Sequence, residues 1–119
     1  VIVMKTISNI VAIGILAFFL STQATASDAP ERMKAMEHVD EAIKHGKMGH
    51  AKELLEHAKE SRDQANAALA AGADAHMDQA VKHLDEAIKH AEMGHADEAT
   101  KHAEEAHNHM HQSGGRAHN

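Results

Sequence analysis

The chain contains 119 residues, of which 13 are histidines and none is cysteine, and its formal net charge is −6 with histidine counted as neutral. The lack of cysteine excludes disulfides, thiolate metal sites and cysteine nucleophiles, and the acidic charge argues against binding to the phosphate backbone of a nucleic acid. The histidines are therefore the feature that an account of function has to explain.

The first 26 residues have the composition of a secretory signal peptide. Lys5 provides a short positive region, residues 7–20 are almost all apolar, and Ala24 and Ala26 fit the small-x-small pattern of a cleavage site. The apolar run is shorter than the roughly 20 residues that span a bilayer. We therefore expect residues 1–26 to be removed, and residues 27–119 to reach the periplasm as one domain without membrane attachment.

An internal repeat organises the rest of the chain. Residues 38–60 align without gaps on residues 83–105, and 15 of 23 positions are identical at an offset of 45. A repeat of this kind indicates one supersecondary unit that occurs twice. The two units, residues 29–71 and 75–112, are each predicted to form a helical hairpin.

Hydrophobic periodicity predicts four helices near residues 29–46, 50–71, 75–92 and 95–112. Short connections favour antiparallel neighbours, so we expect an all-α fold, an up-down-up-down four-helix bundle made of two duplicated hairpins. The last helix has the weakest apolar face, because Leu54 and Leu55 of the first unit correspond to Ala99 and Thr100.

Small and polar residues mark the predicted helix ends. We expect Gly46 and Gly49 to break the first hairpin and Gly94 to break the second. Asp74 is placed to cap the third helix. Residues 113–119, which begin with Ser-Gly-Gly, are expected to form a flexible tail.

The histidines follow a repeated pattern. The motif H-x-x-[E/Q]-x-x-x-H occurs six times, at residues 38–45, 50–57, 76–83, 83–90, 95–102 and 102–109. The central residues are, in order, Glu41, Glu53, Gln79, Glu86, Glu98 and Glu105. Residues three or four apart are neighbours on a helix, so each motif places its three side chains along one stripe. Two histidines seven apart are separated by ~10.5 Å along the helix axis, so one ion needs further ligands from the carboxylate or from the partner helix.

Antiparallel geometry pairs the histidines across each hairpin, because residues at the same height have a constant sum of residue numbers. Five pairs meet this condition: His38 with His57, His45 with His50, His76 with His109, His83 with His102, and His90 with His95. On a helical wheel both rows of a hairpin lie on one flank, away from the core, so we expect an exposed ladder. His107 and His111, four residues apart, form a further candidate chelate.

Imidazole and carboxylate ligands without thiolate suit Cu(II), Ni(II) and Zn(II), and the Irving–Williams order favours Cu(II). We therefore expect several bound ions, chiefly Cu(II), with Ni(II) or Zn(II) as alternatives. Met48 and Met93 lie beside histidines in the turns, where a thioether can assist Cu(I) or simply fill the hairpin end. The candidate metal ligands are His38, Glu41, His45, His50, Glu53, His57, His76, His83, Glu86, His90, His95, Glu98, His102, Glu105, His107, His109 and His111.

Other interpretations fit parts of the pattern. The histidines could be ordinary surface residues of a metal-independent periplasmic helical binding or stress protein, or a pH switch, since histidine titrates near pH 6.5. An enzyme is not expected, because the sequence has no nucleophile motif, phosphate loop or haem motif. Within a predicted helix, the Glu-x-x-His order of bundle di-metal enzymes occurs at Glu104 and His107.

The repeated HxDEAIKH units, in a short cysteine-free chain with an export signal, resemble the small metal-binding protein (SmbP) family of ammonia-oxidising bacteria. The resemblance covers residues 27–119 and carries metal binding onto the repeats at residues 38–57 and 76–109. It implies a periplasmic protein that binds several divalent ions, copper foremost, in copper buffering or tolerance. We expect a monomer whose partners are metal ions.

Overall fold

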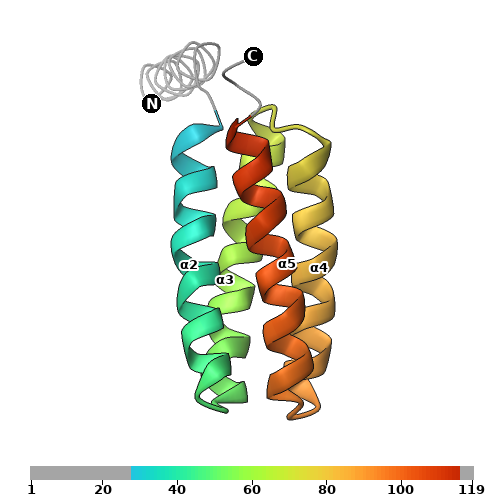
Figure 1. Ribbon diagram of the computed structural model, residues 1–119. Coiled ribbons are helices and arrows are strands. Elements are labelled where there is room, and N and C mark those ends of the chain that lie inside the picture. Colours follow the sequence, from blue (N-terminus) through green and yellow to red (C-terminus); the bar gives the residue numbers. More distant parts are fainter. Residues whose placement is uncertain (1–27, 116–119) are drawn as a thin grey trace, which may run out of the picture.

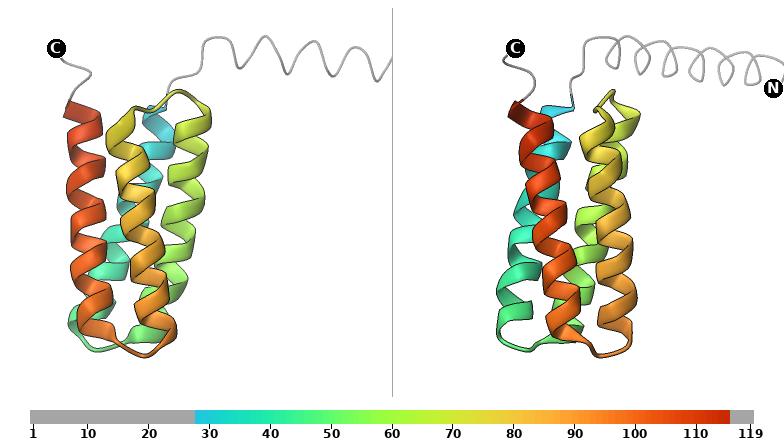
Figure 2. Two further views of the ribbon diagram at one scale, coloured as in Figure 1. Left: turned by 90° about the vertical axis from the view of Figure 1, so that its right-hand side faces the viewer. Right: turned by 45° about the vertical axis from the view of Figure 1, so that its right-hand side comes forward.

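The computed structural model describes residues 28–115, which form four antiparallel helices (Figure 1). The helices are α2 (Ala29–Lys47), α3 (Ala51–Ala70), α4 (Ala75–Glu92) and α5 (Ala96–Gly115). Helix α2 packs on α3 and α5, and α4 packs on the same two helices, which closes the bundle (Figure 2). The predicted all-α four-helix bundle is therefore confirmed. The predicted signal peptide, residues 1–26, and residues 116–119 of the predicted tail lie outside the described residues.

The turns of both hairpins lie at the same end of the bundle (Figure 1). Each turn ends its first helix in the same way: the N–H of His50 donates to the carbonyl of His45 at 2.9 Å, and the N–H of His95 donates to that of His90 at 2.8 Å. The glycine before each of these histidines has a φ of 79° or 78°, a conformation that costs glycine no steric energy. The repeat therefore encodes two equivalent turns.

Gly46 does not break the first hairpin as predicted, because it is a buried residue inside α2. A Cβ atom at Gly46 would lie 2.0 Å from Oγ1 of Thr100 and 2.6 Å from Cδ1 of Leu54. The glycine thus allows α2 and α5 to approach closely. The requirement for glycine comes from packing between hairpins and not from the turn.

The core is built mainly from alanine. The larger buried apolar side chains are Val39, Leu54, Met77, Leu84, Ile88 and Met110. Alanine favours the helical conformation and lets helices approach closely, but each alanine buries little apolar surface. Helices α2, α3 and α5 each bury a single large apolar side chain, whereas α4 buries three. Within residues 28–115, none of the helices has the length and apolarity that a membrane span requires.

Asp74 caps α4 and is linked to the end of α5. Its carboxylate accepts a hydrogen bond from the N–H of His76 at 3.1 Å. Burial raises the pKa of Asp74, but the Ser113 hydrogen bond, the His76 N–H and the charge of His76 outweigh burial and hold the pKa below its usual value. The contact with Ser113 helps to extend α5 to Gly115, three residues beyond the predicted end at residue 112.

Candidate metal site

Two rows of histidines run along the bundle, one in the seam of each hairpin. The first histidine row, between α2 and α3, consists in order of His38, His57, His45 and His50. The second histidine row, between α4 and α5, consists in order of His76, His109, His83, His102, His90 and His95. Because these two seams lie on opposite flanks of the bundle, each hairpin carries its own set of candidate ligands.

The structure brings together all five histidine pairs that the sequence placed at equal heights, with ring centroids 5.8–6.1 Å apart. Diagonal neighbours, such as His45 and His57, are closer still, at 5.3–5.4 Å, and their rings are 10–14° from parallel. The reason is that Cα–Cβ bonds tilt toward the helix N-terminus. In antiparallel helices, His45 and His57 therefore lean toward each other, and each row becomes a continuous zigzag of imidazoles.

The rows are half-buried and not fully exposed as the wheel analysis predicted. The exposed fraction of the side chain is 33% for His38, 29% for His57 and 25% for His83. His50 and His95, which end the two rows at the turns, are exposed. The stacking of rings within each seam accounts for the difference, because each imidazole covers part of the next.

Carboxylates flank the rows at three places. Oε1 of Glu60 lies 3.4 Å from Nδ1 of both His38 and His57. In the second row, Oε1 of Glu105 lies 3.7 Å from Nδ1 of His83. Among residues 28–115, the three groups in which one ligand atom per residue lies within 4.8 Å of the others are His38–His57–Glu60, His83–His102–Glu105 and Glu86–His90–His102. Each group therefore offers two imidazoles and one carboxylate.

Glu60 was missed by the motif analysis, because it follows a histidine by three residues without a second histidine four residues later. The repeat could have found it, since Glu60 corresponds to Glu105 at the offset of 45. The equivalent groups in the two hairpins, with His38 matching His83, show that the duplication preserves a candidate site and not only a fold.

Five imidazole nitrogens in the rows are buried without a hydrogen-bond partner. They are the Nδ1 atoms of His45, His57, His90, His102 and His109. Leaving a buried polar atom unsatisfied costs about 1–3 kcal/mol. A metal ion would accept the lone pair of such a nitrogen, and bonds of about 2.0–2.1 Å place two ligands of one ion within ~4.2 Å. The spacing in the three groups is close to this limit, so small side-chain rotations suffice to complete a site.

The pKa of His109 lies below the ordinary value for histidine. Burial lowers its pKa, and the nearby positive charges of protonated His83 and His76 lower it further, while Glu105 partly opposes them. The imidazole of His109 therefore stays neutral to a lower pH than an ordinary histidine. Neutral imidazole is the form that binds metal.

Several predicted ligands do not join these groups. Glu53 and Glu98 are exposed on the first turns of α3 and α5, and Glu41 lies 3.4 Å from Nζ of Lys44. His111 is exposed, and within residues 28–115 it is absent from the three groups. Within residues 28–115, none of these four residues belongs to a group of three potential ligands.

His107, the predicted chelate partner of His111, contacts an aspartate of α2 in the structure. Its Nε2 lies 3.2 Å from Oδ1 of Asp40, across the interface between α5 and α2. In the first repeat the corresponding residue is Arg62, which pairs with Asp85 at 3.0 Å across the interface between α3 and α4. In both repeats, the residue at this position therefore contacts an aspartate of the other hairpin. His107 does not belong to the second histidine row.

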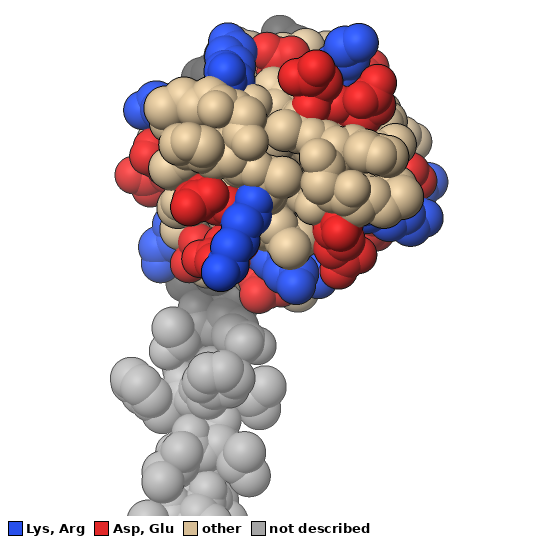
Figure 3. Space-filling model, turned by 90° about the horizontal axis from the view of Figure 1, so that it is seen from below, with Lys and Arg blue, Asp and Glu red and all other residues tan. Residues whose placement is uncertain are grey.

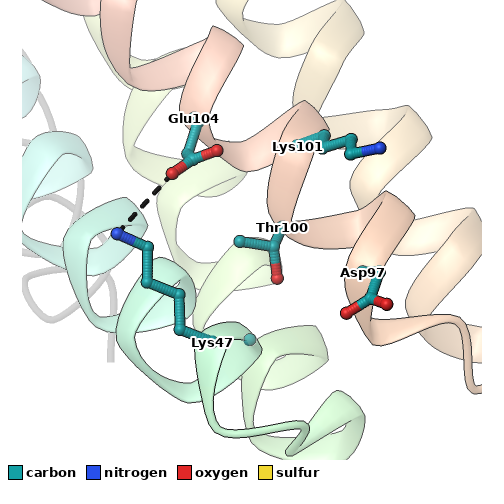
Figure 4. Close-up of a pocket in the computed structure, with 6 residues that line it drawn as sticks. Lys47, Asp97, Thr100, Lys101 and Glu104 are labelled. Atoms are coloured by element: carbon teal, nitrogen blue, oxygen red, sulfur yellow. Dashed lines mark ion pairs between the residues drawn. The ribbon is translucent and has the colours of Figure 1, made fainter.

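A shallow groove at the α2–α5 interface lies away from both rows (Figure 4). Lys47 reaches across it to Glu104, with Nζ and Oε2 3.7 Å apart. Thr100 projects into the groove next to Gly46, while Lys101 points away from the ion pair. The groove is lined by charges of both signs and by the close contact of two helices, so it serves the packing of the hairpins.

The comparison with protein families agrees with this geometry. A family model described as "Small metal-binding protein" matches residues 4–113, nearly the whole chain. No curated protein matches the chain. The matched range includes both histidine rows and all three His/Glu groups.

Proposed function

The chain belongs to the small metal-binding protein family, and we propose that it sequesters several divalent ions, chiefly Cu(II), on its two histidine rows. The observation that carries this proposal is the pair of continuous imidazole rows, in which five Nδ1 atoms are buried without a hydrogen bond. Binding an ion would satisfy these nitrogens, so part of the binding free energy would come from removing an existing cost.

The ligand chemistry supports Cu(II) as the preferred ion. Each of the three groups combines two imidazoles with one carboxylate, a nitrogen and oxygen set that suits Cu(II) and Ni(II), and Cu(II) is first in the Irving–Williams order. Carboxylates such as Glu60 and Glu105 partly neutralise the added positive charge. The net charge of −6 does the same for the whole chain, which favours the accumulation of several dications.

The proposed role is buffering in the periplasm and not catalysis. The signal-peptide pattern in residues 1–26 supports export, and the half-buried rows offer three similar His/Glu groups instead of one specialised centre. Many equivalent sites suit storage, because a buffer needs capacity. Export, the preference for copper and the absence of catalysis are all part of this proposal.

Titration of the purified protein with Cu(II), followed by EPR, tests the proposal. We expect nitrogen ligation and more than one equivalent of bound Cu(II). The variant His38→Gln/His57→Gln/His83→Gln/His102→Gln should lose most of this capacity. The control variant His107→Arg/His111→Gln should retain it, because it keeps the ion pair with Asp40 and leaves the rows intact. A stoichiometry of zero or one in the unaltered protein would contradict the proposal.

Competition experiments separate copper from the alternative metals. With Cu(II), Ni(II) and Zn(II) present together at fixed pH, we expect the protein to retain Cu(II). Preferential retention of Ni(II) or Zn(II) would assign the buffer to that metal. If cells that carry the four-histidine variant tolerate copper as well as cells with the unaltered protein, the role in copper buffering is wrong.

A further inference from the structure

The end of the bundle that carries both hairpin turns has an unusual surface. The turn residues 48–50 and 93–95 are all exposed, and none of them is Lys, Arg, Asp or Glu. Seen from this end, an uncharged band crosses the molecule between acidic and basic residues (Figure 3). The exposed residues of both turns at this end are methionine, glycine and histidine.

Two methionines at this end are exposed without a packing role. The exposed fraction is 58% for Met48 and 59% for Met93, so neither side chain fills the end of its hairpin. Both are retained at the same turn position, although the repeats differ at eight of the 23 aligned positions. Met33, also exposed at 57%, corresponds to Asp78 in the second unit. Both positions are exposed, but the methionine is not retained there, whereas the methionine beside the turn histidines is.

Each turn methionine lies between two histidines along the chain and is tied to the first of them through the backbone. Met48 is the C-cap residue of α2, and its N–H donates to the carbonyl of His45 at 3.1 Å. The rings of His45 and His50 are 5.9 Å apart, and Nδ1 of His45 is buried without a partner. The second turn repeats this arrangement: the rings of His90 and His95 are 6.1 Å apart, and Nδ1 of His90 is also unpartnered.

We infer that each hairpin turn is a separate site for a soft monovalent ion, Cu(I) in particular, bound by one thioether and two imidazoles. The first site consists of His45, Met48 and His50. The second consists of His90, Met93 and His95, and it shares His90 with the Glu86–His90–His102 group. Thioether sulfur is a soft ligand that selects Cu(I), whereas nitrogen and carboxylate ligands suit Cu(II). The three groups described above contain no sulfur, so the ends of the rows differ from their middles in the oxidation state they favour.

This inference deepens the proposed function, on which it rests in treating the imidazoles of the rows as metal ligands. The inference adds Met48 and Met93 as ligands, places a site at each hairpin turn, and assigns Cu(I) to these sites. No electron transfer is involved, because the ion binds in the oxidation state in which it is supplied. The protein would then hold copper in either oxidation state, with Cu(I) confined to one end of the bundle.

The test measures Cu(I) affinity in the absence of oxygen, by competition with a coloured Cu(I) chelator. The unaltered protein should bind Cu(I), and the variant Met48→Leu/Met93→Leu should bind it at least about tenfold more weakly. Leucine keeps an apolar side chain of similar size, so the exposed positions tolerate it. The matched control, Met33→Leu, replaces a methionine with the same exposure and should bind Cu(I) like the unaltered protein. Equal affinity in the double variant and the control would overturn the inference.

Methyl resonances of the methionines provide a second readout. On addition of Ag(I), as a redox-inert substitute for Cu(I), the signals of Met48 and Met93 should shift and that of Met33 should not. Shifts of equal size at all three would show non-specific binding to exposed sulfur and overturn the inference.

The Cu(II) titration separates this inference from the proposed function. If the double methionine variant keeps its Cu(II) capacity while losing Cu(I), both stand. If the protein binds no Cu(II) but shows Cu(I) binding that depends on Met48 and Met93, the buffering of Cu(II) fails and the turn sites remain. If Cu(II) binds and Cu(I) affinity is independent of the methionines, the turn sites fail alone.

Discussion

Arg62 and His107 occupy the same position in the two repeat units, and each contacts an aspartate on a helix of the other hairpin. The aspartates, Asp85 and Asp40, are also equivalent at the offset of 45. A histidine in a histidine-rich helix can therefore have a packing role. The residue at the same position in the other repeat indicates which histidines belong to the rows.

His109 should make the stability of the metal-free protein depend on pH. Its pKa is held below the usual value in the folded state, chiefly by burial, so the unfolded chain takes up a proton at a higher pH than the folded chain. The resulting stabilisation is complete above about pH 6.5 and is lost as the pH falls through the lower folded pKa. Urea unfolding at pH 7.5 and pH 5 should show a smaller loss of stability for His109→Gln than for the unaltered protein. An identical loss in the two proteins would contradict this cause, and His111→Gln provides the exposed control.

Gly46 should not tolerate a methyl group. Alanine is better than glycine inside a helix by about 1 kcal/mol, but the new Cβ would lie 2.0 Å from Oγ1 of Thr100. Overpacking typically costs about 1–3 kcal/mol, so we expect Gly46→Ala to lower the free energy of unfolding. Urea denaturation measures this change. Adding Thr100→Ala should recover part of the loss, and a stabilised single variant would show that α2 and α5 are less tightly packed.

At the scale of whole helices, the two hairpins are alike in their turns and unlike in their cores. Both turns use the same glycine conformation and the same hydrogen bond between histidines. Helix α3 buries Leu54, whereas the corresponding position of α5 is Ala99. Helix α5 is held instead by Met110, by the contact of Ser113 with Asp74 and by the ion pair of His107. These contacts explain why a helix without Leu, Ile or Val still packs along its full length.

Asp74 should contribute more to stability than Asp28, the residue at the equivalent N-cap position of α2. The Asp74 carboxylate accepts a hydrogen bond from the backbone of α4, whereas Asp28 makes no side-chain cap hydrogen bond. Loss of an N-cap costs about 0.5–2 kcal/mol, so Asp74→Ala should unfold at a lower urea concentration than Asp28→Ala.

The contribution of Asp74 should also depend on pH. Its folded pKa is below the ordinary value of 3.8, so its stabilisation is present above that pH and disappears as the pH falls through the folded pKa. The difference between Asp74→Ala and the unaltered protein should therefore be smaller at pH 2 than at pH 7. A difference that is independent of pH would mean that the carboxylate charge has no part in the cap.

At the scale of the whole molecule, an alanine core is combined with rows of unpartnered imidazoles. The core buries few large side chains, and five buried nitrogens lack hydrogen bonds. Both features lower the free energy of unfolding of the metal-free bundle. Ligand binding and folding should therefore be linked, because the rows exist as pairs of imidazoles only when the helices of each hairpin are packed together.

Cu(II) should raise the melting temperature of the protein. At a free concentration about 100 times the Kd, one site adds ~2.7 kcal/mol, and for a domain of this size each kcal/mol corresponds to about 4–8 °C. We therefore expect an increase on the order of 10 °C or more, measured by circular dichroism. The four-histidine variant should show a much smaller rise. A melting temperature that Cu(II) leaves unchanged would show that the rows do not bind the ion in the folded state.

The four helices, the duplication and the five histidine pairs could be predicted from the amino-acid pattern, because helical periodicity and the antiparallel hairpin are local properties of the chain. Three features depended on tertiary structure: the position of Gly46 against Thr100, the contact of His107 with Asp40, and the zigzag contact of His45 with His57. The first two arise between hairpins, whose relative register no local pattern specifies. The third arises from the direction of the Cα–Cβ bonds once two helices face each other, and it converts separate pairs of histidines into continuous rows.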